Sequence, residues 1–234
     1  KPKPSDKNNE IPPEFQAIMA TIADNLQAIR GRLAGSAPAT LLAVSKGQSI
    51  ERVREAVAAG QKAFGENYVQ EALEKMTVME REARGLEWHL IGPLQSNKTR
   101  PVAERFDWVQ TLASEKIARR LSEQRPAEKA PLNVLIQVNA SGEASKAGVS
   151  PQDVLPLSRE VKKLANLRLR GLMAIPEPGA PRERYREMKA LFDRSRAVFD
   201  FDTLSMGMSD DLDVALAEGA TMVRVGTAIF GARS

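Results

Sequence analysis

The sequence contains no cysteine and a single histidine among its 234 residues. The absence of cysteine excludes disulfides, thiolate metal sites and cysteine nucleophiles. Because only one histidine is present as well, a transition-metal site lacks its usual ligands, and we expect no metal. No apolar run approaches the ~18 residues that a membrane span needs, and no secretory signal pattern is visible. We therefore expect a cytoplasmic protein without a membrane partner.

Composition and charge are ordinary for a soluble globular protein. Hydrophobic residues make up 42% of the chain and charged residues 27%, and the formal net charge is +4. So modest a charge gives weak support for a nucleic-acid partner, and we expect none. Residues 1–13, KPKPSDKNNEIPP, are polar and proline-rich without apolar periodicity, which predicts a disordered N-terminal tail.

Two hydrophobic periods alternate through residues 14–234, which we interpret as a single domain. Strand-like runs are expected at 40–46, 62–67, 86–92, 107–112, 132–139, 167–175, 202–208 and 221–231. Segments with helical spacing lie at 14–32, 50–59, 68–84, 99–105, 114–124, 151–164, 182–199 and 210–218.

This alternation indicates an α/β protein with a parallel sheet covered by helices. Eight strands within roughly 200 residues favour a closed (β/α)8 TIM barrel. An open doubly wound sheet is the rival, but no G-x-G-x-x-G follows the first strand. Little sequence follows the eighth run, so we expect the helix at 14–32 to cover that flank.

In such a barrel the functional residues gather where the strands end. The predicted strand ends carry Lys46, Asn67, Asn139 and the segments 89–92, 173–175, 205–209 and 224–227. Partial desolvation at the barrel mouth is expected to lower the pKa of Lys46 and to leave an amine that condenses with aldehydes. A solvated lysine that caps the strand is the alternative. For His89, the one histidine, the alternative to a functional role is a structural one.

The segments SMGMSDD and VRVGTAIFG fall on strands seven and eight, where barrels commonly bind phosphate. Ser205 and Thr227 offer hydroxyl groups, and Gly207 and Gly226 allow the backbone close to an anion. Ser209 is predicted to be the N-cap of the helix at 210–218. In each segment the alternative is that the glycines serve only tight turns and bind no anion. An aldehyde-reactive lysine together with a phosphate site suggests pyridoxal 5′-phosphate (PLP).

Several motifs resemble one family, the YggS/PROSC pyridoxal phosphate homeostasis proteins, from about residue 14 to the C-terminus. They are LLAVSK, FGENYVQEA, WHLIGPLQSNK, IQVNASGEASKAG, GLMAI and LSMGMSDDLDVALAEGATMVRVGTAIFG. The resemblance implies a fold-type III barrel like the N-terminal domain of alanine racemase, lacking the C-terminal β-domain of alanine racemases. It also implies that Lys46 forms a Schiff base with PLP.

The same resemblance implies roles for the other candidate residues. Ser205, Gly226 and Thr227, with Gly207 nearby, would hold the phosphate, and Arg224 would face the pyridine nitrogen. Asn67, His89 and Met173 would line the ring pocket. Lys146, in GEASKAG, is expected to be a loop lysine, and a functional role for it stays open.

A cofactor site does not by itself make an enzyme. PLP is a stronger electron sink when its ring nitrogen is protonated, and an arginine facing that nitrogen opposes protonation. Racemisation by two bases needs a second acid–base group, yet the only tyrosines are Tyr68 and Tyr185, neither in an additional domain.

We therefore expect a monomeric binding protein that takes up PLP reversibly and acts in PLP homeostasis, by buffering or by delivery to PLP-dependent apo-enzymes, without robust catalysis. A small PLP-dependent amino-acid racemase or lyase is the first alternative. A cofactor-free scaffold or a nucleic-acid-binding protein, with pI ≈ 9.4, is the second.

Overall fold

Eight parallel strands close into a barrel in this computed structural model, which describes residues 20–141 and 147–231. Each strand pairs with its neighbour in the chain, and β1 pairs with β8. The strands are β1 (Thr40–Val44), β2 (Ala63–Glu66), β3 (Glu87–Leu90), β4 (Trp108–Leu112), β5 (Leu132–Val138), β6 (Leu167–Ala174), β7 (Thr203–Ser205) and β8 (Met222–Val225). The predicted (β/α)8 barrel is confirmed. The predicted tail at 1–13 and Lys146 lie outside the described residues.

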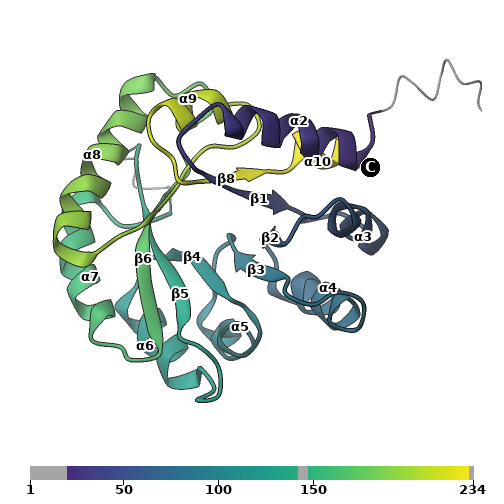
Figure 1. Cartoon of the computed structure of the whole chain (residues 1–234). Helices are drawn as coiled ribbons and strands as arrows, with labels where there is room; N and C mark the ends of the chain where they lie inside the picture. The colour runs from purple at the N-terminus through teal and green to yellow at the C-terminus, as the bar shows by residue number, and fades with distance from the viewer. Residues whose placement is uncertain (1–19, 142–146, 232–234) are drawn as a thin grey trace, which may run out of the picture.

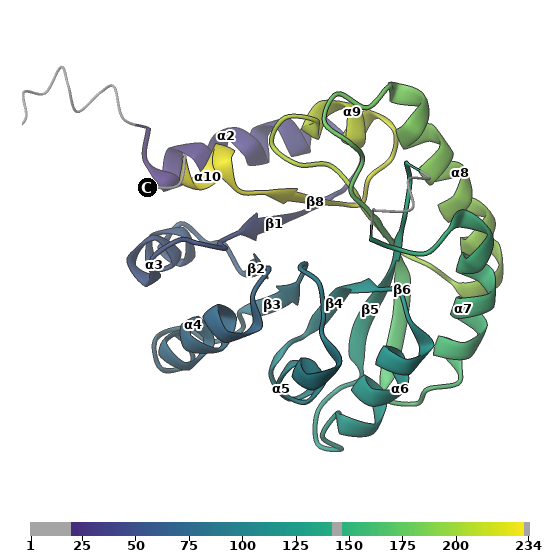
Figure 2. The same cartoon turned by 180° about the vertical axis from the view of Figure 1, so that it is seen from behind.

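Helices surround the barrel, as Figures 1 and 2 show from its two sides. They are α2 (Ile22–Ala34), α3 (Ile50–Ala58), α4 (Val69–Glu82), α5 (Thr99–Arg105), α6 (Glu115–Gln124), α7 (Val154–Lys162), α8 (Arg182–Phe199), α9 (Leu212–Ala217) and α10 (Thr227–Phe230). Two short 3-10 helices, η1 (Ser96–Lys98) and η2 (Pro151–Asp153), precede α5 and α7. No helix of these described ranges is long and apolar enough to cross a membrane.

The first helix closes the flank between the last strand and the first. Its buried residues recur at helical spacing and are Ile22, Leu26, Ile29 and Leu33. A capping box between Thr21 and Asp24 fixes where α2 begins. In Figures 1 and 2, α2 lies beside α10 and covers β8 and β1, the position that the sequence predicted for the helix at 14–32. The predicted start is wrong at residues 20 and 21, which precede α2, and residues 14–19 lie outside the described residues.

The predicted eighth strand is too long, because the chain turns after Val225. Gly226 bends the backbone, and its carbonyl accepts the N–H groups of Ile229 and Phe230, each at 2.9 Å. These two side chains are buried in the core that includes residues of α2. Thr, Ile and Phe have strand propensity, so the sequence alone reads α10 as strand, whereas tertiary burial decides for helix.

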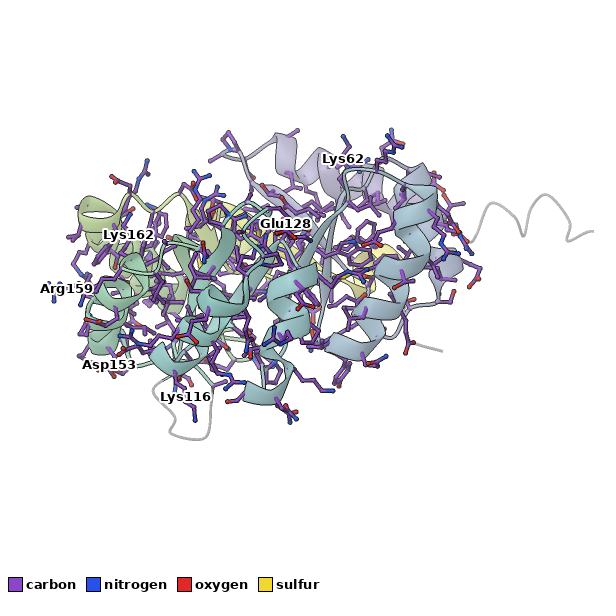
Figure 3. All side chains as sticks on the ribbon, turned by 90° about the horizontal axis from the view of Figure 1, so that it is seen from below. Lys62, Lys116, Glu128, Asp153, Arg159 and Lys162 are labelled. Atoms are coloured by element: carbon purple, nitrogen blue, oxygen red, sulfur yellow. The ribbon has the colours of Figure 1, made fainter. Side chains whose placement is uncertain are left out.

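Two apolar layers hold the barrel. The outer layer packs the strands against the helices. The inner layer fills the barrel and consists of Leu42, Ala63, Trp108, Leu135, Met173 and Met222. Figure 3 shows the barrel from the side: Lys62 and Glu128, which precede β2 and β5, lie toward one rim, and Lys116 and Asp153, which follow β4 and β5, lie toward the other. The second rim is the carboxyl end of the strands.

Candidate functional site

A cavity of about 260 Å³ opens at the carboxyl rim, lined by segments that follow β1, β2, β3, β6, β7 and β8. Its volume is close to the lower end of the range of about 300–1,000 Å³ for small-molecule sites. Five predicted site residues line it: Lys46, Asn67, Arg224, Gly226 and Thr227. Gln48, Ile91 and Asp210 also line it. Ile91 lies at the predicted end of the third strand and Asp210 in the segment SMGMSDD, but none of the three was named as a site residue.

Lys46 follows β1 by two residues and is half-buried against the cavity. Side chains of helix α4 bond to the peptide groups on both sides of Lys46. Lys75 Nζ donates to the carbonyl of Ser45 at 2.6 Å, and the N–H of Gly47 donates to Glu71 Oε1 at 2.6 Å. The backbone that carries the Lys46 amine is therefore fixed from outside the barrel.

Lys75 belongs to a charged cluster buried between β1, β2 and α4. Its Nζ donates to Glu66 Oε1 at 2.8 Å and to Glu71 Oε1 at 2.6 Å, and Ser45 Oγ donates to Glu66 Oε1 at 2.6 Å. Glu66 is fully buried, so desolvation raises its pKa, while Lys75 opposes that shift. This cluster was not among the predicted features of the sequence. Its available signal is a lysine on the apolar stripe of α4, beside Ala72, Met76 and Met79.

Asn67 presents an unusual acceptor at the end of β2. Its Oδ1 is buried and has no hydrogen-bond partner among the described residues. The chain after β3 passes directly over Asn67, because a Cβ at Gly92 would lie 2.2 Å from the Asn67 carbonyl oxygen. Only glycine permits this approach, which keeps Asn67 at the cavity wall.

Arg224, on β8, places a buried cation in the cavity wall. The residue is 4% exposed, its Nη1 donates to Ser205 Oγ at 2.7 Å and its Nη2 donates to the carbonyl of Ala174 at 2.8 Å. Burial lowers the pKa of Arg224 to about 10, and the charge of Asp211 opposes that shift. The guanidinium thus remains positively charged at neutral pH.

The structure does not place Ser205, His89 and Met173 among the lining residues. Each is fully buried in the barrel. The Ser205 hydroxyl bonds to Arg224 and Gln110. His89 stacks on Trp108 with ring centroids 5.0 Å apart, and Met173 belongs to the inner apolar layer. These residues lie beneath the cavity and support its wall.

The loops after β7 and β8 meet at the cavity. Ser209 lines it and its Oγ accepts the N–H of Ala228 at 3.3 Å. The prediction that Ser209 caps the next helix is wrong, because α9 begins after Asp211, whose carboxylate accepts the N–H of Met208 at 2.5 Å. Gly207 is not a lining residue. Its φ of 96° makes the turn, and its carbonyl accepts the N–H of Arg224 at 2.9 Å.

Neither tyrosine lines the cavity. Tyr68 is 65% exposed at the start of α4. Tyr185 is buried on α8 and donates to Asp211 Oδ2 at 2.6 Å, and desolvation together with this bond raises its pKa. Neither phenol is positioned as a proton donor or acceptor for a ligand in the cavity.

The family model described as alanine racemase, N-terminal domain, matches residues 19–234. A pyridoxal phosphate homeostasis protein of Pseudomonas aeruginosa is 56% identical over 92% of this chain and 97% of its own. The chain belongs to the pyridoxal phosphate homeostasis protein family. The resemblance in the motifs is thereby confirmed.

Solved structures agree with this assignment to the homeostasis family. PipY of Synechococcus elongatus, solved with PLP bound, has a TM-score of 0.81 and 35% identity, covering 90% of this chain and all of PipY. An alanine racemase of Corynebacterium glutamicum has a TM-score of 0.72 and 17% identity, and this chain covers 61% of it. The similarity to the alanine racemase shows only that the two proteins share the barrel fold.

Proposed function

We propose that this chain binds pyridoxal 5′-phosphate in the cavity at the carboxyl rim and serves PLP homeostasis, as a store or as a donor to PLP-dependent apo-enzymes. The observation that carries the proposal is the meeting of an amine, Lys46, and a buried cation, Arg224, in one small cavity. The PLP-bound structure of PipY supports it. A cytoplasmic location, a single domain over 14–234 and the absence of nucleic-acid partners belong to the same proposal.

The residues of the cavity fit the chemistry of this ligand. A phosphate group accepts hydrogen bonds, and the hydroxyl groups of Ser209 and Thr227 beside Gly226 are suited to bind it. The unpartnered Asn67 Oδ1 needs a donor, which the ring hydroxyl of PLP offers. Ser205 is better suited to hold Arg224 than to bind the phosphate, because its hydroxyl is already bonded on two sides.

When bound, PLP supplies a reactive aldehyde and a ring that accepts electrons. Lys46 Nζ attacks the aldehyde carbon, a C=N bond replaces the C=O bond, and the oxygen leaves as water. Addition of water reverses these steps, so release requires no other reactant. A reversible covalent link of this kind suits a store better than a permanent attachment does.

The surroundings of the cavity favour binding over catalysis. Arg224 keeps its positive charge where a ring nitrogen would lie, which disfavours the protonated ring that strong carbanion stabilisation needs. Tyr68 and Tyr185 lie away from the cavity lining, so neither supplies the second base of a racemase. We therefore propose that the chain is not an enzyme.

The absorbance spectrum of the purified protein with added PLP tests the proposal. We expect a visible band for the wild type that Lys46→Ala abolishes, while weak non-covalent binding remains. Lys62→Ala is the matched control, because Lys62 is an exposed lysine near the opposite rim (Figure 3). Its band should equal that of the wild type.

Two further measurements separate this proposal from its rivals. Borohydride reduction followed by peptide mapping should find the adduct on Lys46, and an adduct found only on Lys146 would contradict the assignment. Incubation of the loaded protein with L- and D-amino acids should give no steady turnover. Turnover at enzyme-like rates would favour a racemase or lyase, and no uptake of PLP would favour a cofactor-free scaffold.

A further inference from the structure

A chain of hydrogen bonds crosses the barrel interior from the cavity wall toward the amino rim. Arg224 Nη1 bonds to Ser205 Oγ at 2.7 Å, and Ser205 Oγ bonds to Gln110 Oε1 at 2.7 Å. Gln110 Nε2 bonds to His89 Nδ1 at 2.9 Å, and His89 Nε2 bonds to Glu87 Oε1 at 2.8 Å. The Ser205–Gln110 bond joins β7 to β4, two strands that are not neighbours in the barrel. All members except Glu87 are buried.

The donors of this chain can be assigned in one direction only. A guanidinium has no acceptor, so Arg224 donates to Ser205, whose own proton must then go to Gln110 Oε1. The amide nitrogen of Gln110 carries only donors, so His89 Nδ1 must be the acceptor. His89 is then neutral with its proton on Nε2, and it donates that proton to the carboxylate of Glu87. Each link is satisfied by this single arrangement.

The charges around His89 agree with this arrangement. Burial lowers the pKa of His89, while Glu87 and the nearby Asp107 oppose that shift. The hydrogen bond from His89 lowers the pKa of Glu87, which therefore stays a carboxylate. Arg170, whose guanidinium carbon lies 4.8 Å above the Trp108 ring, also lowers the pKa of Glu87 by its charge and bonds to Asp202.

We propose that Ser205, Gln110 and His89 are positioning residues that hold the Arg224 guanidinium in the cavity wall through this one-directional chain. A buried cation is costly unless its N–H groups are bonded, and the chain bonds the Arg224 guanidinium through neutral groups, with its one carboxylate, Glu87, at the far end. Hydrogen bonds in series polarise one another, so the carboxylate of Glu87 stabilises Arg224 from the far end. The consequence for PLP rests on the proposed function, whereas the chain itself is a property of the protein without ligand.

Nuclear magnetic resonance of the ligand-free protein tests the chain directly, because His89 is the only histidine. We expect its nitrogen signals to show a proton on Nε2, none on Nδ1, and no titration between about pH 6 and 8, where an ordinary histidine titrates. A proton on Nδ1, or ordinary titration in that interval, would overturn the proposal. This measurement needs no variant and no ligand.

Gln110→Glu changes the chain with little change in shape. A carboxylate accepts from Ser205 but cannot donate to His89 Nδ1, so we expect His89 to become protonated at neutral pH. The new carboxylate, which lies closer to Arg224 along the chain than His89 does, should draw the guanidinium away from the cavity, so PLP should bind about tenfold more weakly. The added negative charge should move the pH midpoint of the bound ligand's absorbance upward. Gln152→Glu, an exposed site in η2, is the matched control and should change none of these.

Ser205→Ala separates positioning from a structural role. It removes the acceptor of Arg224 Nη1 but leaves the Nη2 bond to Ala174 and the Gln110–His89 bond. His89 should therefore stay neutral while PLP affinity and the absorbance midpoint change. If either variant lowers stability and leaves affinity and midpoint at wild-type values, the positioning role is refuted. If the wild type takes up no PLP, the proposed function fails. In that case the N–H signals of His89 and Arg224 in the wild type still test the hydrogen-bond chain without a ligand. We expect them to show slowed rotation of the Arg224 guanidinium.

Discussion

Single side chains behind the cavity are as important for the geometry of the site as those that line it. Lys46 contacts the cavity, but Lys75 and Glu71 hold the peptide groups on either side of it. Arg224 is likewise held by groups that no ligand would touch. The reactive amine and the cation are each positioned by buried polar residues, so substitutions at a distance should alter the site.

Lys75→Met should destabilise the protein by about 3–5 kcal/mol, because it leaves Glu66 as a buried charge without its partner. Urea denaturation measures this loss. Glu66→Gln combined with Lys75→Met should recover most of it, since no buried charge is then left without a partner and Glu71, the third charge of the cluster, is partly exposed. Lys62→Met, an exposed lysine, should stay within about 0.5 kcal/mol of the wild type. A loss equally large in the double variant would contradict this account.

The sequence predicted which residues lie at the strand ends better than it predicted how deep in the barrel their side chains lie. Alternation along β7 and β8 turns Ser205 and Arg224 inward, and the structure bonds them to each other. Only Arg224 reaches the cavity, because depth depends on strand tilt and stagger, which one strand's sequence does not contain. Gln110 was overlooked, although a polar residue inside an apolar strand is a recognisable signal.

Strands and helices position the site through the turns that join them. The turn after β7 requires Gly207, whose φ is 96° and where an added Cβ would lie 2.5 Å from Ala215 Cβ on α9. The same turn supplies the carbonyl that accepts the Arg224 N–H. This turn therefore couples α9 to the cavity wall.

Gly207→Ala should cost more stability than Gly85→Ala, which serves as its control. Both glycines have positive φ, but nothing lies within 4 Å of a Cβ at Gly85. Gly85→Ala should cost about 1–2 kcal/mol from the backbone conformation alone. The clash with Ala215 should add about 1–3 kcal/mol at Gly207. Equal losses in thermal or urea unfolding would show that the clash is relieved without cost.

Elements with a clear period were predictable, and short ones at the rim were not. The ranges of α5 and α8 coincide with the prediction: α8 has a long stripe of buried residues, and a proline lies near the start of each helix. α10 and the start of α9 differ from the prediction. The four residues of α10 are helical because they contact α2, which is far away in the sequence. The six residues of α9 begin after Asp211, whose carboxylate bonds to the N–H of Met208 in the preceding turn.

The whole molecule should be a monomer in solution. The barrel closes on itself through β1 and β8, so its sheet has no free edge that invites pairing with a second copy. Light scattering coupled to size exclusion should give a mass near 25.6 kDa, with and without PLP. A mass near twice this value would contradict the prediction and would call for mapping of the interface.

The closed circle also brings the first and last described segments together. Asn25 on α2 bonds to the carbonyl of Ile229 on α10 at 2.9 Å, and the two helices lie side by side in Figures 1 and 2. A short linker from residue 231 to residue 20 should therefore span the gap. New termini could be opened in the exposed connection at 127–131 near the amino rim. Circular permutation is tolerated at such surface loops, so a rearranged gene should still encode the same barrel.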